Sequence, residues 1–225
     1  MPRTCFDLTH PIATDMPVYP GDPTVTVTGV ATVVADGCSV RSLSLGTHTG
    51  THVDAPAHVD QGGRTVDGIL PGELIGTASV LHIPALRPGE IITPAHLGAW
   101  RPARIVLIAT GWDAHWGTDA YSTYPVLGEE ACRLLTDAGM HLLGLDTASP
   151  DPPGADVLSV HDLLLGADHL IIENLRGLAD LPSSVEFTAL PLPLVGGDGS
   201  PVRAVARRRT ACQEGRRGNP SGWSD

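Results

Sequence analysis

The sequence has no lysine, few aromatic residues and no long apolar run, and its net charge and the missing apolar run limit the class of protein. All 14 basic residues are arginines, and 25 acidic residues bring the net charge to −11, which argues against a nucleic-acid partner. No segment approaches the roughly 18 apolar residues of a membrane span. The N-terminal residues lack the apolar region of a signal peptide. We therefore expect a cytoplasmic protein without nucleic-acid or membrane partners.

Paired cysteines are also missing, because no two cysteines are spaced as a C-x-x-C pair. This excludes the usual thiolate zinc and redox motifs. We expect three buried or half-buried thiols and one thiol in the C-terminal tail; the four residues are Cys5, Cys38, Cys132 and Cys212.

The 225 residues, of which 42% are hydrophobic, suit one domain with an extended core. We predict strands by alternation or β-branched content at residues 24–30, 40–45, 78–83, 104–110, 141–146, 169–174 and 186–192. We predict helices at residues 93–100, 128–139 and 159–166. Helices between strands favour an α/β fold, with a mainly β part before residue 84. The domain covers residues 1–207, and the arginine-rich residues 208–225 are predicted to be a disordered tail.

The stretch "LGTHTGTHVDAPAHV" (residues 45–59) carries three histidines and an aspartate within eleven residues: His48, His52, Asp54 and His58. It is too polar for a core strand and too rich in glycine and threonine for a stable helix. A metal site, a loop that is merely rich in histidine and a hydrogen-bonded turn would each account for it.

The residue types of this stretch favour the metal site. Imidazole and carboxylate groups together suit zinc, manganese or iron, and a cluster without cysteine is not a structural thiolate zinc site. The Thr-Gly-Thr segment between His48 and His52 and the later Pro56 make a helix unfavourable. We therefore expect a turn at the end of strand 40–45, in which Gly46 and Gly50 let the side chains converge.

A metal site needs further ligands or a base from elsewhere in the chain, and two residues are candidates. His161 lies in the first turn of a short predicted helix, and Glu173 ends the apolar run "HLIIEN". Spacing alone favours a structural interpretation of both, with His161 as a cap or surface residue and Glu173 as an exposed acid at a strand end.

The motif "HTGTHVDAPAH" resembles the signature of the metal-dependent cyclase family, which includes bacterial kynurenine formamidase and isatin hydrolase. The resemblance extends over most of the chain, through "MPVYPGDP", "ATGWDAHWG", "GLDTASPD", "VHDLLLGADHLIIENLRGL" and "ALPLPLVGGDGSPVRAVAR". It implies a swivelling β/β/α domain with a mixed sheet and flanking helices, which assembles as a homodimer or a larger homo-oligomer.

The resemblance also implies the functional residues. His48, His52 and Asp54 match the ligands of a first metal ion, either zinc or manganese. His58, His161 and Glu173 match ligands of a second ion bridged by Asp54, or catalytic residues that relay protons where only one ion is bound. Tyr19, in "VYPGD", matches the substrate loop, at a position where kynurenine formamidases tend to carry tryptophan.

The implied activity is hydrolysis of an amide-type C–N bond in a small molecule, by metal-activated water. Aryl formamides such as N-formylkynurenine and lactams are the substrate classes, and Tyr19 leaves the choice between them open. Trp112 and Trp116 could line an aromatic pocket or belong to the core. A lactone hydrolase or a ring-forming cyclase of secondary metabolism would use the same metal site, and a protein that binds metal without catalysis is the third alternative.

Overall fold

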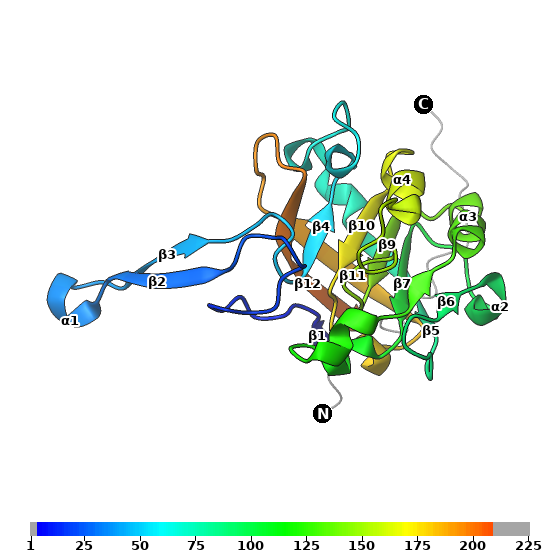
Figure 1. Cartoon of the computed structure of the whole chain (residues 1–225), viewed down its shortest axis with the longest axis horizontal. Coiled ribbons are helices and arrows are strands. Elements are labelled where there is room, and N and C mark those ends of the chain that lie inside the picture. Colours follow the sequence, from blue (N-terminus) through cyan, green and yellow to red (C-terminus); the bar gives the residue numbers. More distant parts are fainter. Residues whose placement is uncertain (1–3, 209–225) are drawn as a thin grey trace, which may run out of the picture.

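The computed structural model describes residues 4–208, and its centre is an eight-stranded mixed sheet that curls into a barrel-like arrangement (Figure 1). The strands follow one another across the sheet as β1 (Cys5–Asp7), β12 (Gly199–Arg208), β11 (Ser184–Pro191), β5 (Ile75–His82), β7 (Ile105–Ala109), β9 (Leu142–Leu145), β10 (Leu170–Glu173) and β4 (His52–Asp54). Strands β5, β7, β9 and β10 are parallel neighbours. The short strand β4 pairs antiparallel with both β10 and β12 and so closes the barrel.

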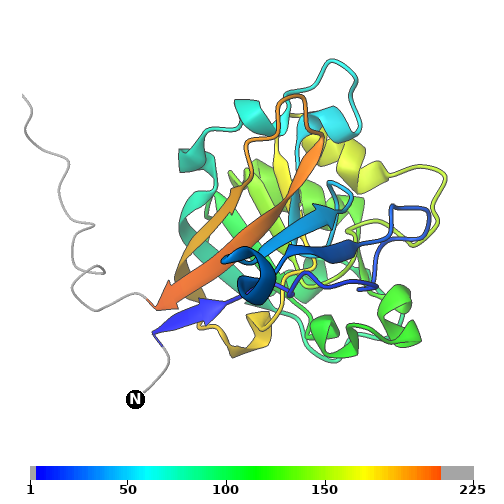
Figure 2. The ribbon, with the colours of Figure 1, turned by 90° about the vertical axis from the view of Figure 1, so that its left-hand side faces the viewer.

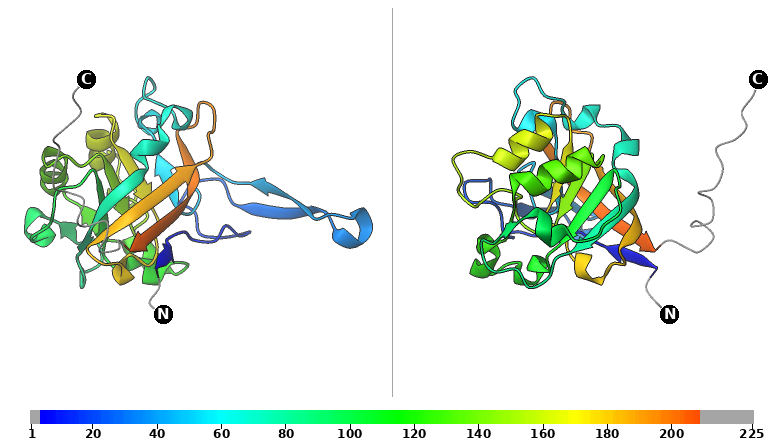
Figure 3. Two further views of the ribbon diagram at one scale, coloured as in Figure 1. Left: turned by 180° about the vertical axis from the view of Figure 1, so that it is seen from behind. Right: turned by 90° about the vertical axis from the view of Figure 1, so that its right-hand side faces the viewer.

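Three helices cover the outer face of the parallel strands: α2 (Pro94–Leu97), α3 (Glu129–Asp137) and α4 (Ser159–Leu165) (Figure 3). Alternation along the strands creates two cores. Leu107 and Ile172 belong to the core inside the barrel, whereas Val106 and Ile171 belong to the core under the helices. The predicted α/β class with a mixed sheet and flanking helices is therefore confirmed.

All seven predicted strands and all three predicted helices are present, with ends shifted by a few residues. The connections contain a small two-stranded sheet of β6 (Ile91–Ile92) and β8 (Val126–Leu127). They also contain short 3₁₀ turns: η1 (Pro56–His58), η2 (Val66–Gly68), η3 (Pro71–Glu73), η4 (Trp112–His115), η5 (Asp119–Thr123) and η6 (Leu178–Asp180).

A long hairpin projects away from the barrel, and we call it the arm (residues 26–44) (Figures 1 and 2). It consists of β2 (Thr26–Ala31), the one-turn helix α1 (Val33–Asp36) and β3 (Val40–Ser44). The Thr32 hydroxyl caps α1 by accepting a hydrogen bond from the Ala35 amide, and Gly37 ends the helix with a φ of 75°. These local signals fix the turn at the tip of the arm.

The cysteine prediction was wrong for two residues. Cys5 and Cys38 are exposed, because β1 is an edge strand and Cys38 lies in the arm, and only Cys132 is buried. Cys212 and the predicted tail, apart from Arg208, lie outside the described residues. None of the helices in the described part of the chain is long and apolar enough to cross a membrane.

A half-buried ion cluster fastens the loop after η1 to the strands beside it. The guanidinium of Arg64 donates to both carboxylate oxygens of Glu73, at 2.6 and 3.0 Å, and to Asp168 at 3.0 Å. Nε2 of His141 lies 2.7 Å from Glu73. Asp168 lies two residues before β10, the strand that ends in Glu173, and Arg64 lies in the loop after η1, which carries His58. The ion cluster therefore joins two segments that carry candidate site residues.

We expect Glu73→Gln to lower the free energy of unfolding by about 2 kcal/mol at neutral pH, because Arg64 loses its charged partner. The hydrogen bond from Arg64 lowers the pKa of Glu73 from 4.5 to about 2. This stabilisation is therefore complete above pH 4.5 and is lost as the pH falls through about 2. Denaturant titrations across this range test the prediction, with the exposed Glu130→Gln as control. A loss that stays constant down to the lowest pH at which the protein is folded would contradict it.

Candidate metal centre

The centre is built on the outer face of two paired strands, β4 and β10. In β4 the side chain of Val53 points into the barrel core, so His52 and Asp54 point outward. Glu173 on β10 is the register partner of His52. Cross-strand partners have neighbouring side chains, so pairing alone brings an imidazole and a carboxylate together.

The prediction that residues 45–59 are too polar for a core strand was wrong for His52–Asp54, which form a strand with every residue buried. The polar side chains are tolerated because both face other polar groups rather than the apolar core. The turn was predicted correctly for the residues before β4. There Gly50 has a φ of 61°, a left-handed conformation that glycine adopts without strain.

His48 lies in this turn and contacts a carboxylate with each ring nitrogen. Its Nδ1 is 2.7 Å from Oδ1 of Asp54, and its Nε2 is 3.0 Å from Oδ2 of Asp198. A Cβ atom at Gly199 would lie 2.6 Å from the His48 ring, so only glycine leaves room for the imidazole there. The ring is thus held between β4 and the start of β12.

His52 is oriented by the backbone of the same turn. Its Nδ1 donates to the Gly50 carbonyl oxygen at 2.8 Å. Its Nε2 then faces the carboxylates, 3.1 Å from Oδ1 of Asp54 and 3.4 Å from Oε2 of Glu173. This arrangement leaves Nε2 of His52 free to bind a cation.

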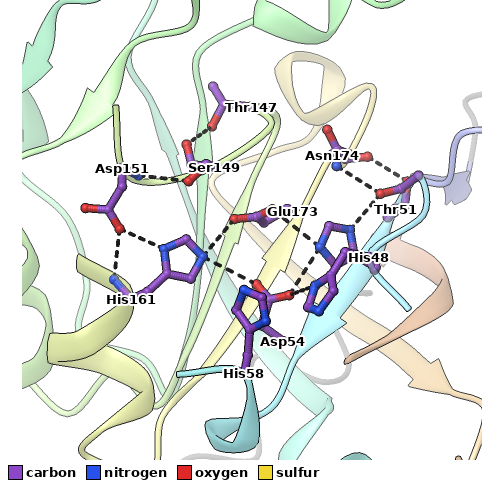
Figure 4. A network of polar contacts seen from close by, with 12 residues as sticks. His48, Thr51, Asp54, His58, Thr147, Ser149, Asp151, His161, Glu173 and Asn174 are labelled. Atoms are coloured by element: carbon purple, nitrogen blue, oxygen red, sulfur yellow. Dashed lines mark hydrogen bonds and ion pairs between the residues drawn. The ribbon is translucent and has the colours of Figure 1, made fainter. Parts of the chain in front are cut away.

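His161 reaches the same point from helix α4 and is buried there (Figure 4). Its Nδ1 donates to Asp151 at 2.7 Å, and its Nε2 lies 3.3 Å from Oε1 of Glu173 and 3.9 Å from Oδ2 of Asp54. The Asp151 carboxylate also accepts hydrogen bonds from the backbone N–H groups of Val160 and His161. The structural interpretations of His161 and Glu173 as surface residues were therefore wrong, since both are at most 6% exposed.

Five residues thus form one group, in which all but the half-buried His48 are buried. We call it the cluster: His48, His52, Asp54, His161 and Glu173. Burial alone would lower the pKa of His161, but the hydrogen bond to Asp151 and the negative charge of the nearby Glu173 raise it to about 10. Burial alone would raise the pKa of Asp54, yet His52 and His48 hold it well below its usual range. The carboxylates therefore create a negative potential that favours positive charge at this place.

Three buried atoms of the cluster have no hydrogen-bond partner within residues 4–208: Nε2 of His52, Oδ2 of Asp54 and Oε1 of Glu173. Buried polar atoms are normally satisfied, so these three need a ligand. Two sets of three donor atoms, each set within 4.8 Å, could share an ion: His48, His52 and Asp54 form one, and Asp54, His161 and Glu173 form the other. Imidazole and carboxylate donors at this spacing fit Zn²⁺ or Mn²⁺.

His58 lies at the exposed edge of the cluster, on η1. Its ring is 4.1 Å from the ring of His48 and 5.7 Å from the ring of His161. Its Nδ1 lies 3.4 Å from Asp198, and a third set of donor atoms consists of His48, His58 and Asp198. The structure therefore brings His58 to the centre, but on the side of Asp198 rather than of Glu173.

The predicted substrate residues lie in two different surroundings. Tyr19 is 37% exposed, and its hydroxyl accepts a hydrogen bond from the Gly154 amide at 3.0 Å. Trp112 is buried, and its ring N–H donates to the Tyr121 carbonyl oxygen. Trp116 is half-buried and stacks on His10, with ring centroids 3.9 Å apart. Trp112 therefore belongs to an aromatic core, whereas Trp116 lies at its border.

Sequence reasoning missed three residues that orient the cluster: Asp151, Asp198 and Asn174. Asn174 has a φ of 55°. Its side-chain amide donates a hydrogen bond to the Gly50 carbonyl oxygen, which also accepts the hydrogen bond from Nδ1 of His52. The side-chain oxygen of Asn174 accepts a hydrogen bond from the Tyr121 hydroxyl. The Thr51 hydroxyl donates a hydrogen bond to the backbone carbonyl oxygen of Asn174 (Figure 4). The only available signals were that Asn174 ends a predicted strand and that Asp198 lies in a glycine-rich segment, and nothing marked Asp151.

We expect Asp151→Asn to weaken metal binding or activity by about 10- to 100-fold, because His161 loses the carboxylate that fixes its tautomer. Competition with a chelator measures the affinity, and steady-state kinetics measures the rate. The exposed Asp156→Asn, from the same loop, is the matched control. A lower melting temperature with unchanged metal affinity and pH–rate profile would instead assign Asp151 to anchoring α4 only.

Residues 6–152 match the model of the cyclase family. The chain belongs to this family. It is 37% identical over 213 residues to a kynurenine formamidase of Bordetella avium (strain 197N), an alignment that covers 91% of this chain and 98% of that protein.

Solved structures of family members show the same fold. Isatin hydrolase A from Ralstonia solanacearum superposes with a TM-score of 0.80 and is 26% identical, covering 91% of this chain and 92% of that one. A predicted metal-dependent hydrolase from Bacillus stearothermophilus gives a TM-score of 0.75 at 29% identity, covering 91% and 98%. These relatives are named as a formamidase and as hydrolases, as the resemblance implied.

Proposed function

We propose that this protein is a metal-dependent hydrolase that cleaves an amide-type C–N bond of a small molecule. The substrate is an aryl formamide, such as N-formylkynurenine, or a lactam. The observation that carries the proposal is the cluster of three histidines and two carboxylates, with buried atoms that lack partners, in a chain related to kynurenine formamidase and isatin hydrolase.

The metal ligands follow from the two sets of donor atoms. His48, His52 and Asp54 would hold one ion. Asp54, His161 and Glu173 would hold a second, with His58 at the exposed side. Zinc or manganese, as one ion or two, agrees with this donor set. When bound, the metal supplies a hydroxide nucleophile at neutral pH and Lewis-acid polarisation of the substrate carbonyl.

The protein residues move the proton that hydrolysis requires. Attack of water on the carbonyl carbon releases a proton, and the leaving nitrogen must gain one when the C–N bond breaks. Where only the first ion is bound, Glu173 and His161 are not ligands, and Glu173 can accept the first proton because its Oε1 has no hydrogen-bond partner in the described structure. His161, 3.3 Å from that oxygen and anchored by Asp151, can pass a proton to the nitrogen. His58 is the alternative donor when it is not a ligand.

The remaining features of the proposal concern the whole protein. We place it in the cytoplasm, as a single domain over residues 1–207 that forms a homodimer or a larger homo-oligomer. The family resemblance implies the assembly, and the exposed apolar arm supports it.

Metal analysis together with a substrate screen tests the function. Protein purified without a metal-affinity step is expected to hold one to two equivalents of Zn or Mn by elemental mass spectrometry, and His52→Ala is expected to hold less. The loaded enzyme should then hydrolyse a formamide or a lactam. Release of product only from lactones, or ring closure, would assign the alternative activity. Absence of metal in both proteins, before and after adding it, would refute the proposal.

A further inference from the structure

The hydroxyl of Tyr124 is a buried polar atom whose presence the fold does not explain. The side chain belongs to the same aromatic core as Trp112 and is 1% exposed. Among the residues that the structure describes, none forms a hydrogen bond with this hydroxyl. Tyr121, three residues earlier, is also buried, but its hydroxyl donates to the side-chain oxygen of Asn174 at 2.7 Å. Of the two tyrosines, only Tyr121 is therefore accounted for as an anchor.

The backbone places Tyr124 next to the loop that orients one histidine of the cluster. Tyr124 directly follows η5, and the N–H group of Leu127 donates to the Pro150 carbonyl oxygen at 2.8 Å. The chain after Tyr124 thus runs beside Asp151, the residue that holds His161 (Figure 4). The orphan hydroxyl is therefore close to the metal centre, although it belongs to neither set of buried donor atoms there.

The surroundings of the hydroxyl keep it protonated. Burial raises the pKa of Tyr124 above its usual value, and the nearby Tyr19 and Glu173 raise it further. The Ser149 hydroxyl lies close by but forms no hydrogen bond with it. Tyr124 therefore has an O–H group that is free to donate, near the predicted substrate residue Tyr19 and near Glu173.

A buried hydroxyl without a partner is unfavourable for the fold. It has lost its hydrogen bonds to water and has gained none from the protein. Phenylalanine would fill the same space without this cost. Because buried polar groups are normally satisfied, the Tyr124 hydroxyl indicates a hydrogen-bond acceptor that comes from outside the chain.

The substrate classes proposed above supply such an acceptor. In N-formylkynurenine, the ring carbon next to the one that bears the formamide nitrogen carries a ketone. Isatin, an aryl lactam, has a ketone at the same relative position. The amide carbonyl that is attacked must lie at the metal, so the ketone oxygen remains for a donor placed beside the metal centre.

We propose that the Tyr124 hydroxyl donates a hydrogen bond to a ketone oxygen of the substrate, on the ring carbon adjacent to the one that bears the scissile amide nitrogen. The inference rests on the proposed function and narrows its substrates to aryl formamides or lactams with this ortho ketone. Tyr124 binds and selects the substrate and takes no part in proton transfer. A site built to hydrogen-bond a substrate group rejects analogues without that group, because its buried donor then stays unpaired.

Stability measurements on the metal-loaded protein are the first test. Tyr124→Phe removes only the hydroxyl, so metal content should stay the same and the melting temperature should equal or exceed that of the wild type. Tyr121→Phe is the contrasting variant and should melt at a lower temperature, because Asn174 loses its donor. Ser122→Ala removes an exposed hydroxyl from η5 and should match the wild type. Loss of metal or a lower melting temperature in Tyr124→Phe would make its hydroxyl structural and overturn the proposal.

Paired substrates test the selection. One pair is 2-formamidoacetophenone and formanilide, and the other is isatin and oxindole; only the first compound of each pair has the ketone. In Tyr124→Phe, KM for the ketone compound of the pair that is hydrolysed should rise at least tenfold with kcat within threefold, because the ketone accepts the same bond in the ground and transition states. The values for its partner compound should change less than threefold. An equal loss for both compounds, or no loss for either, would overturn the proposal.

Binding without turnover separates this inference from the proposed function. 2-Aminoacetophenone keeps the ketone but has no amide to cleave, and aniline has neither group. By isothermal titration calorimetry, the metal-loaded wild type should bind 2-aminoacetophenone at least tenfold more tightly than aniline, and Tyr124→Phe should bind the two within threefold of each other. Equal binding of both by the wild type would overturn the proposal. Selective binding without hydrolysis of any of the four substrates would refute the proposed function and still support the contact between Tyr124 and the ketone.

Discussion

Replacing Asp54 by asparagine is expected to remove the bound metal and to lower kcat/KM by at least about 1000-fold. Asp54 belongs to two of the sets of donor atoms, the one with His48 and His52 and the one with His161 and Glu173. Its Oδ1 lies 2.7 Å from His48 and 3.1 Å from His52, and its Oδ2 lies 3.9 Å from His161. Asparagine keeps the shape but removes the charge and replaces one oxygen by an amide that donates hydrogen bonds.

Elemental mass spectrometry and steady-state kinetics on the same preparation measure the effect of Asp54→Asn. Asp60→Asn is the matched control, because Asp60 is exposed just beyond η1 and its carboxylate accepts only the nearby Gly62 amide among the contacts described. Circular dichroism should show that both proteins are folded. Full metal content in Asp54→Asn, or activity within tenfold of the wild type, would remove Asp54 from the centre.

Glu173→Gln is expected to lower kcat by about 100- to 10,000-fold, the range that a positioned acid or base contributes. The substitution is isosteric, so the register of β10 with β4 should survive. It leaves the set of His48, His52 and Asp54 unchanged, so at least half of the metal should remain bound. The expected result is therefore a protein that retains metal and binds substrate but turns it over slowly.

Single-turnover kinetics together with metal analysis separates the two roles of Glu173. The control is Glu129→Gln, on the exposed face of α3. Complete loss of metal in Glu173→Gln would make Glu173 essential for binding the ion, and the kinetic effect would then follow from that loss. Normal metal content and a normal rate would exclude it as the group that carries the proton.

The core of the fold was predictable because its strands have strong local patterns. Runs such as residues 104–110 are apolar and β-branched over most of their length, and the helix at Glu129–Asp137 has acids in its first turn and Gly139 beyond its end. Strand β4 could not be predicted in this way. It has only three residues, and two of them are polar because they form the centre.

The site itself was predictable only in part. The motif from His48 to His58 is local in sequence, so its spacing was visible. Asp198 is 150 residues from His48, and their contact depends on the closing of the barrel. Asp151 is only 10 residues from His161, but no pattern in the sequence indicated that the two residues pair. His161 and Glu173 gave no sufficient signal by themselves, and only the family resemblance linked them to the motif. Burial then distinguished them from surface residues.

The double pairing of β4 also affects the order in which the protein can be assembled on the ribosome. Its three residues pair with residues 171–173 and 199–201, so the motif strand waits until nearly 150 further residues have been synthesised. At about 5–20 residues per second this delay is roughly 8–30 s. During that time the edge of β4 is open to other strands. Polar and charged residues at a strand edge discourage such pairing in other sheets, and β4 carries two of them, His52 and Asp54.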